Sequence, residues 1–146
     1  MRIPDYPKLW LAVMIALGWA IGRLAPHGPQ WLAWVGGLAA SGGLALLIAA
    51  AMQMRRMDTP SDPYGAPRHL VTGGLFAHSR NPIYLADAII LGGLTLAFRA
   101  PLAVVPLVAA FVTIITLRFI HAEEARLAAA FPAAFAAYCA RTRRWL

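Results

Sequence analysis

An uncharged apolar run from Trp31 to Met54 is the feature that most restricts how this chain can fold. As a helix it would be about 36 Å long, and the hydrocarbon core of a bilayer is about 30 Å thick. A soluble chain of 146 residues has too small an interior to bury such a helix together with its other apolar segments. The run therefore predicts a helix that crosses a membrane with some tilt.

Three further apolar runs predict three more spanning helices, at residues 9–24, 83–98 and 102–120. Charged residues make up 13% of the chain, whereas about 25% is usual in soluble proteins. The first run is interpreted as a span and not as a cleaved signal peptide, because no small-residue cleavage site follows it. We expect one all-α, polytopic membrane domain over residues 1–146, with about four transmembrane helices and a C-terminal interfacial helix.

Glycine pairs occur twice in the run from Trp31 to Met54. Because small residues let two membrane helices approach closely, we expect these positions to pack against a neighbouring helix and not to form a ligand site. The glycines concerned are Gly36, Gly37, Gly42 and Gly43.

The basic residues flank the apolar runs and form no continuous basic face. Despite a net charge of +7, we therefore expect no nucleic-acid partner. With four spans, eleven of the thirteen Lys and Arg residues share one side, and only Arg23 and Arg99 lie on the other. The positive-inside rule then predicts cytoplasmic termini in an integral membrane protein, which we expect in a bacterial inner membrane. The single Cys139 excludes an internal disulfide and a Cys-based zinc site, and we expect no metal.

Two polar segments interrupt this apolar sequence on the predicted cytoplasmic side. Residues 69–84 read HLVTGGLFAHSRNPIY and residues 121–127 read HAEEARL. Glu123 and Glu124 follow directly after a span, where a carboxylate has to find water, a base or a cationic ligand. One interpretation is a hydrated helix start. The other is that the acidic pair meets the Arg80 segment and forms a site for a ligand that carries both signs of charge.

The two segments resemble the motifs of the integral-membrane methyltransferases that include isoprenylcysteine carboxyl methyltransferase and phospholipid methyltransferases. The resemblance covers roughly residues 68–146, about half of the chain, and rests on two paired motifs at the expected separation. The chain departs from the family pattern at Pro132, where Gly is usual, and at Asp87, where small residues are usual. The matching positions are Leu70, Val71, Gly74, Phe76, Arg80, Asn81, Pro82, Tyr84, Glu123, Glu124, Leu127, Phe131, Tyr138, Arg144 and Trp145.

The resemblance implies that S-adenosylmethionine binds on the cytoplasmic side, between the two segments, and that a lipophilic acceptor enters from the bilayer. The acceptor stays open among an isoprenylcysteine-like carboxylate, a lipid amine and a thiol. Arg80 would bind the cofactor's carboxylate, and Glu124 its ammonium or ribose. The residues assigned to the cofactor are His69, Leu70, Val71, Gly74, Leu75, Phe76, Arg80, Asn81, Pro82, Glu123 and Glu124. Those assigned to catalysis are Arg80, Asn81, Tyr84, Arg118 and Glu124.

Two other functions remain as alternatives. Membrane sterol reductases carry a similar Arg-His/Asn-Pro-x-Tyr segment and use NADPH, although an acidic pair has the wrong sign for a cofactor with three phosphates. A non-catalytic membrane protein, such as a transporter or an assembly factor, would place charge along a pathway through the spans. Here Asp87 is the only acidic residue inside a predicted span.

Asp87 is expected to pair with Arg118. Asp87 lies about one turn inside the third predicted span, and Arg118 lies at a similar depth on the fourth. The short turn between these spans should make them pack side by side, and an unpaired charge there would be costly.

The polar loop and the tail carry three further expectations. Residues 55–67 are expected to form a lid or a connector, because prolines and glycine make the loop irregular. Pro132 is expected to bend or restart the C-terminal helix. The basic and aromatic residues that follow should anchor it beside anionic lipid headgroups. They are Arg141, Arg143, Arg144 and Trp145.

Overall fold

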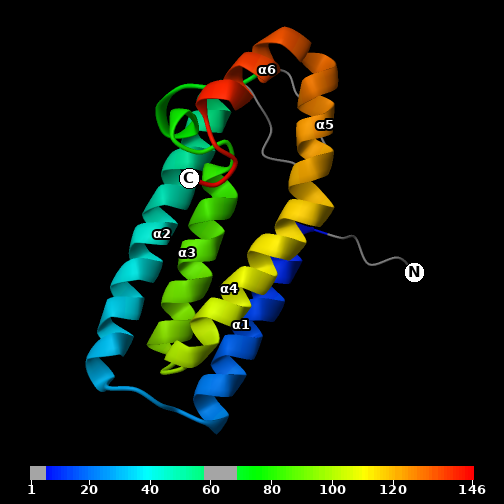
Figure 1. Cartoon of the computed structure of the whole chain (residues 1–146). Coiled ribbons are helices and arrows are strands. Elements are labelled where there is room, and N and C mark those ends of the chain that lie inside the picture. The colour runs from blue at the N-terminus through cyan, green and yellow to red at the C-terminus, as the bar shows by residue number, and fades with distance from the viewer. Residues whose placement is uncertain (1–5, 58–68) are drawn as a thin grey trace.

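The computed structural model describes residues 6–57 and 69–146, and within these residues it contains helices and no strand. The four long apolar helices run side by side (Figure 1) and coincide with the predicted spans to within a few residues, which confirms the all-α fold. Most of the expected lid or connector, residues 58–67, lies outside the described residues. The four helices are α1 (Pro7–Leu24), α2 (Gln30–Arg56), α3 (Pro82–Ala97) and α4 (Pro101–Ile115).

Three stretches are long and apolar enough to cross a membrane, namely Pro7–Leu24, Gln30–Arg56 and Pro101–Ala130. The third stretch is continuous because α4 passes through a π-helical turn, Thr116–Ile120, into α5 (His121–Ala130). α3 is also apolar but has 16 residues, so it is only about 24 Å long. α5 therefore projects beyond the first turn of α3 (Figure 1).

α2 and α3 pack with their backbones in contact. A Cβ atom at Gly36 would lie 2.5 Å from the carbonyl oxygen of Gly93, and one at Gly43 would lie 2.9 Å from a side chain of α3. Gly37 and Gly42 have no atom within 4 Å of a Cβ position, because they lie on the other side of α2. The expected packing role is therefore confirmed for Gly36 and Gly43 and is wrong for Gly37 and Gly42.

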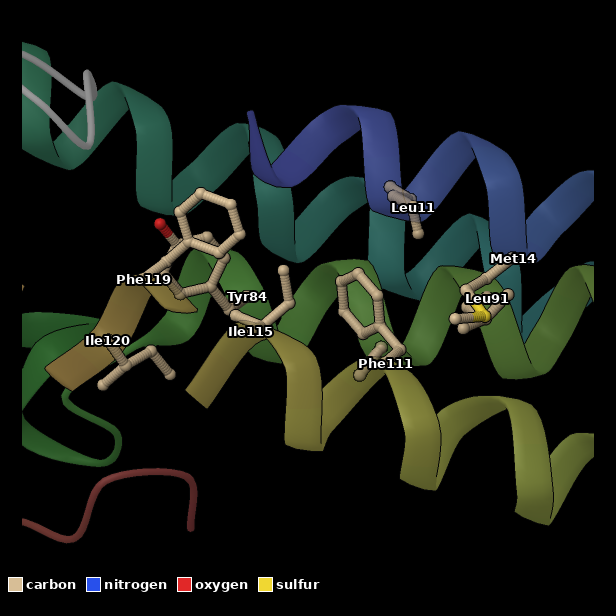
Figure 2. Close-up of a cluster of buried hydrophobic side chains, with 9 residues drawn as sticks. Leu11, Met14, Tyr84, Leu91, Phe111, Ile115, Phe119 and Ile120 are labelled. Atoms are coloured by element: carbon tan, nitrogen blue, oxygen red, sulfur yellow. The ribbon is translucent and has the colours of Figure 1, made fainter. Parts of the chain in front are cut away.

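α1 and α4 pack on α3 through larger side chains, which form a continuous apolar cluster (Figure 2). Leu91 of α3 and Phe111 and Ile115 of α4 are completely buried in it, and α1 contributes Leu11 and Met14. In lipid such a cluster is held mainly by van der Waals packing. α3 thus lies at the centre of the bundle, in contact with α1, α2 and α4.

The C-terminal segment folds back over the end of the bundle (Figure 1). α5 ends at Ala130 and α6 (Pro132–Arg141) begins at the proline, which confirms the predicted restart. Two aromatic residues of α6, Phe135 and Tyr138, pack against Val71 and Phe76 in a second apolar cluster. This cluster fixes the loop before α3 against the end of the chain.

The predicted lipid anchor stays a prediction, and two of its four residues also have partners within the protein. Trp145 Nε1 donates to Thr116 Oγ1 at 3.2 Å, and Arg144 binds Glu124 through two hydrogen bonds. Both side chains are used inside the protein because the turn after α6 brings the chain end back to the first polar segment.

Candidate functional site

A cavity of about 340 Å³ lies where α1 begins, α2 ends and α3 begins. Its volume falls in the range of small-molecule sites, about 300–1,000 Å³. α2 forms an apolar wall, charged groups come from the start of α1, the turn before α3 and α5, and the second cluster supplies aromatic rings. The described residues that line it are Tyr6, Pro7, Lys8, Leu47, Ala51, Met54, Phe76, Arg80, Asn81, Pro82, Ile83, Tyr84, Glu123, Glu124, Leu127, Phe135 and Tyr138.

Glu124 joins the two polar segments and the chain end. Its Oε1 accepts from Arg80 Nη2 at 2.9 Å and from Arg144 Nε at 3.0 Å, and its Oε2 accepts from Arg144 Nη2 at 2.7 Å. The Glu124 side chain is only 16% exposed. The hydrogen bond with Glu124 raises the pKa of Arg144 above its ordinary value. Glu124 is therefore held as a carboxylate between two guanidinium groups.

One nitrogen of the Arg80 guanidinium has no hydrogen-bond partner among the described residues. Its Nη1 donates to the carbonyl of Thr142 at 2.7 Å, and its Nη2 donates to Glu124. Its Nε is buried, and among the described residues it has no hydrogen-bond partner. A buried donor without a partner costs free energy, about 1–3 kcal/mol. Arg80 also lines the cavity, so its guanidinium places a positive charge at the wall.

Glu123 faces a different neighbour. The hydroxyl of Tyr84, in the first turn of α3, donates to Glu123 Oε1 at 2.5 Å. Both residues line the cavity. Adjacent residues on a helix point about 100° apart. Glu124 therefore reaches Arg80 and Arg144, while Glu123 reaches Tyr84.

The turn before α3 is built by its own sequence. The amide of Asn81 donates to Ser79 Oγ at 3.1 Å, and Asn81 Nδ2 donates to the carbonyl of Arg144 at 3.0 Å. Pro82 then occupies the first helical position, where its missing N–H costs nothing. The amide of Arg80 donates to the carbonyl of Arg143 at 3.0 Å. This turn is thereby docked on the C-terminal residues.

The loop that leads to this turn is fixed by a side chain of α2. Gln53 Nε2 donates to the carbonyl of Gly73 at 2.6 Å, and Gln53 Oε1 accepts from the amide of Leu75 at 3.1 Å. Gly74 lies between them at φ +57°, a conformation that favours glycine. Tyr138 donates its hydroxyl to the carbonyl of Phe76 at 2.5 Å, and burial raises the pKa of Tyr138 to about 12.

The structure gathers about half of the predicted site residues at the cavity. The lining includes Phe76, Arg80, Asn81, Pro82, Tyr84, Glu123 and Glu124. Leu70 and Val71 lie in the second cluster, and Gly74 and Leu75 lie against Gln53. His69 stands at the exposed start of this loop. The roles assigned to these five residues in cofactor binding stay predictions.

The predicted pair of Asp87 and Arg118 is wrong. Asp87 is completely buried and accepts from Lys8 Nζ at 2.6 and 2.8 Å. The guanidinium of Arg118 lies 5.4 Å from the ring centroid of Trp10, in a cation–π arrangement. Arg118 is in the π-helical turn, whose extra residue changes the direction of its side chain. It is not among the residues that line the cavity, so its assigned role in catalysis stays a prediction.

Sequence reasoning missed the contribution of α1 to the site. α1 begins at Pro7, so Lys8 belongs to a helix and lines the cavity together with Tyr6 and Pro7. One signal was present. An acid inside a membrane span requires a cation, and Lys8 is at the end of its span that lies on the same side as Asp87.

Comparison with known proteins gives one match. A family model described as phospholipid methyltransferase matches residues 31–134, more than two thirds of the chain. The match includes both polar segments and begins after α1. No curated protein and no solved structure matches the chain. With its two motif segments inside the match and joined at one cavity, the chain belongs to the phospholipid methyltransferase family and is an integral membrane methyltransferase.

Proposed function

We propose that this protein transfers a methyl group from S-adenosylmethionine to a lipid amine, on the cytoplasmic side of the membrane. Family membership supports the reaction class. The observation that carries the proposal is the presence of both charges in one cavity, with the guanidinium of Arg80 in one wall and Glu123 in another. A cofactor with a carboxylate, an ammonium and a sulfonium needs both.

The residues of the cavity fit this cofactor. Arg80 would bind its carboxylate, because the guanidinium places a positive charge at the cavity wall and can form a charge-assisted hydrogen bond. Phe76 and Tyr138 would pack against its adenine. Both oxygens of Glu124 already accept from arginines, so we assign Glu124 the positioning of Arg80.

The remaining walls favour an amine over a carboxylate as the acceptor. A carboxylate acceptor beside Glu123 would meet a like charge, whereas an ammonium would be attracted. The apolar wall of α2 extends from Met54 to Leu47, about 10 Å along the helix, which suits an acyl chain. The family description, phospholipid methyltransferase, supports the same choice.

The residues of the chain would then act by position and by proton transfer. When bound, S-adenosylmethionine supplies an electrophilic methyl group. Glu123 would accept the proton that the amine loses, and the Tyr84 hydroxyl, 2.5 Å away, would hold this carboxylate in place. The apolar wall of α2 would exclude water and align the acceptor.

Ligand-dependent melting of the purified protein in neutral detergent tests the proposal. S-adenosylhomocysteine should raise the melting temperature, because a ligand that binds only the folded state stabilises it. NADPH should not. Stabilisation by NADPH alone would favour the reductase alternative, and no response to either would favour a non-catalytic membrane protein.

Transfer of a labelled methyl group identifies the acceptor class. The label should appear in vesicles that contain phosphatidylethanolamine, and not in a prenylcysteine carboxylate or an alkyl thiol. Label in either of the latter two and not in the lipid amine would overturn the acceptor assignment.

A further inference from the structure

α1 brings a lysine to the cavity from outside the region that matches the family. The match begins at residue 31, whereas Lys8 is the second residue of α1 and lines the cavity. A cation at this position is unfavourable for the helix itself, because the N-terminus is the positive end of the helix dipole. Helix stability therefore does not explain Lys8.

Lys8 and Asp87 form an ion pair whose two ends have different surroundings. The Asp87 side chain is completely buried, while the Lys8 side chain is 56% exposed. The positive end of the pair therefore faces the cavity. An ammonium has three donors, and within the described part of the chain only the two oxygens of Asp87 accept from this one. One N–H is left for a bound group.

We propose that Lys8 binds the anionic phosphate of the acceptor lipid and so determines which lipids the cavity takes. The proposal rests on the function proposed above. Asp87 acts as a positioning residue, because it holds the ammonium at the cavity with two hydrogen bonds. The positive end of the α1 dipole adds to the attraction for an anion. The acyl chain of the same lipid lies along the apolar wall of Leu47, Ala51 and Met54.

Variants at the pair separate an anion-binding role from a purely structural one. Dodecyl phosphate is the probe, dodecanol is the uncharged control, and binding is measured by thermal shift in a neutral maltoside detergent. The key variant is Lys8→Met with Asp87→Asn, because it removes both charges and leaves no buried charge unpaired. Asp87→Asn alone keeps the ammonium. Arg23→Met, at the exposed far end of α1, removes a cation away from the cavity.

The double variant should bind dodecyl phosphate about tenfold more weakly than the wild type, which is the loss expected for one charge-assisted hydrogen bond. Arg23→Met should bind it as the wild type does, and dodecanol should not distinguish the variants. Asp87→Asn should bind it less tightly than the wild type and more tightly than the double variant, because it keeps the ammonium but loses the carboxylate that positions it. Binding of dodecyl phosphate by the double variant at wild-type affinity would show that Lys8 only neutralises Asp87. If inorganic phosphate stabilised the wild type as much as dodecyl phosphate does, and lost this effect in the double variant, Lys8 would belong to a site for free anions. That result would overturn the assignment to a lipid.

A second measurement needs no variant. Lys8 is the only lysine of the chain, so acetylation of its amine can be followed by mass spectrometry in the wild-type protein. Dodecyl phosphate should slow this acetylation and dodecanol should not; equal rates with both would overturn the proposal.

S-adenosylhomocysteine is tested on the same sample. If dodecyl phosphate binds and S-adenosylhomocysteine does not, the anionic lipid subsite is retained and the methyltransferase proposal is rejected. If S-adenosylhomocysteine binds and dodecyl phosphate does not, only the role of Lys8 is rejected.

Discussion

At the scale of residues, the adjacent carboxylates of Glu123 and Glu124 meet different partners. Glu124 binds Arg80 and Arg144, and Glu123 accepts from Tyr84. Neighbouring positions on a helix do not face the same way, so one acidic pair can serve two walls of a cavity. The charge of Arg80 is positioned at the cavity by Glu124.

Arg80→Ala should therefore abolish most of the affinity for S-adenosylhomocysteine. A hydrogen bond to a charged group contributes about 1.5–3 kcal/mol, so we expect a loss of about 10- to 100-fold. Glu124→Gln should also weaken binding, because Arg80 then loses the carboxylate that positions it. Arg23→Ala is the control, since Arg23 lies at the opposite end of α1. If calorimetric titration with S-adenosylhomocysteine gave wild-type affinity in both site variants, the cofactor would bind elsewhere.

At the scale of elements, the contact between α2 and α3 determines where the apolar wall of the cavity stands. The two helices approach so closely that a Cβ atom at Gly36 would lie 2.5 Å from backbone atoms of α3. The same helix carries Leu47, Ala51 and Met54 to the cavity and Gln53 to the loop before α3. A shift of α2 would therefore move both the wall and the loop.

Gly36→Ala and Gly37→Ala form a matched pair that tests this contact. Gly36→Ala should lower the stability by about 1–3 kcal/mol, because the added methyl group must push two backbones apart. Gly37→Ala should leave it unchanged or raise it, because nothing lies within 4 Å of that Cβ position and Ala is the better helix former. Thermal unfolding in detergent gives the comparison. Equal effects of the two changes would mean that α2 does not pack through Gly36.

At the scale of the whole molecule, the antiparallel arrangement of the helices returns every functional segment to one end. The start of α1, the end of α2, the start of α3 and α5 all meet there, and the last residues of the chain dock against them (Figure 1). Eleven of the thirteen basic residues belong to this end in a four-span topology, which predicts that it faces the cytoplasm.

Reporter fusions test this orientation. A fluorescent protein that matures only in the cytoplasm should be active when fused after Leu146. Alkaline phosphatase, which is active only outside the cytoplasm, should be active when fused after Gly28, in the turn between α1 and α2. The reverse pattern would show that the site end faces away from the cytoplasm, and activity of the same reporter at both positions would reject the four-span topology.

Much of the site could be read from the sequence, because its motif residues are close together in the chain. Arg80, Asn81 and Tyr84 lie within two turns of one another, and a cavity between them and the acidic pair follows once α3 and α4 form a hairpin. The contribution of α1 could not be read in this way. Lys8 is 79 residues from Asp87, and several cations compete for a partner at similar depth.

The sequence by itself predicted the four long helices to within a few residues, because hydropathy over a span, proline positions and charge at the flanks are local properties of the chain. Only the tertiary structure decided which charges pair. Helix rotation about its axis selects the partner of Asp87, the π-helical turn directs Arg118 to Trp10, and the returning C-terminus brings Arg144 to Glu124. These choices depend on packing between elements far apart in the chain, and local patterns do not decide among the candidate partners.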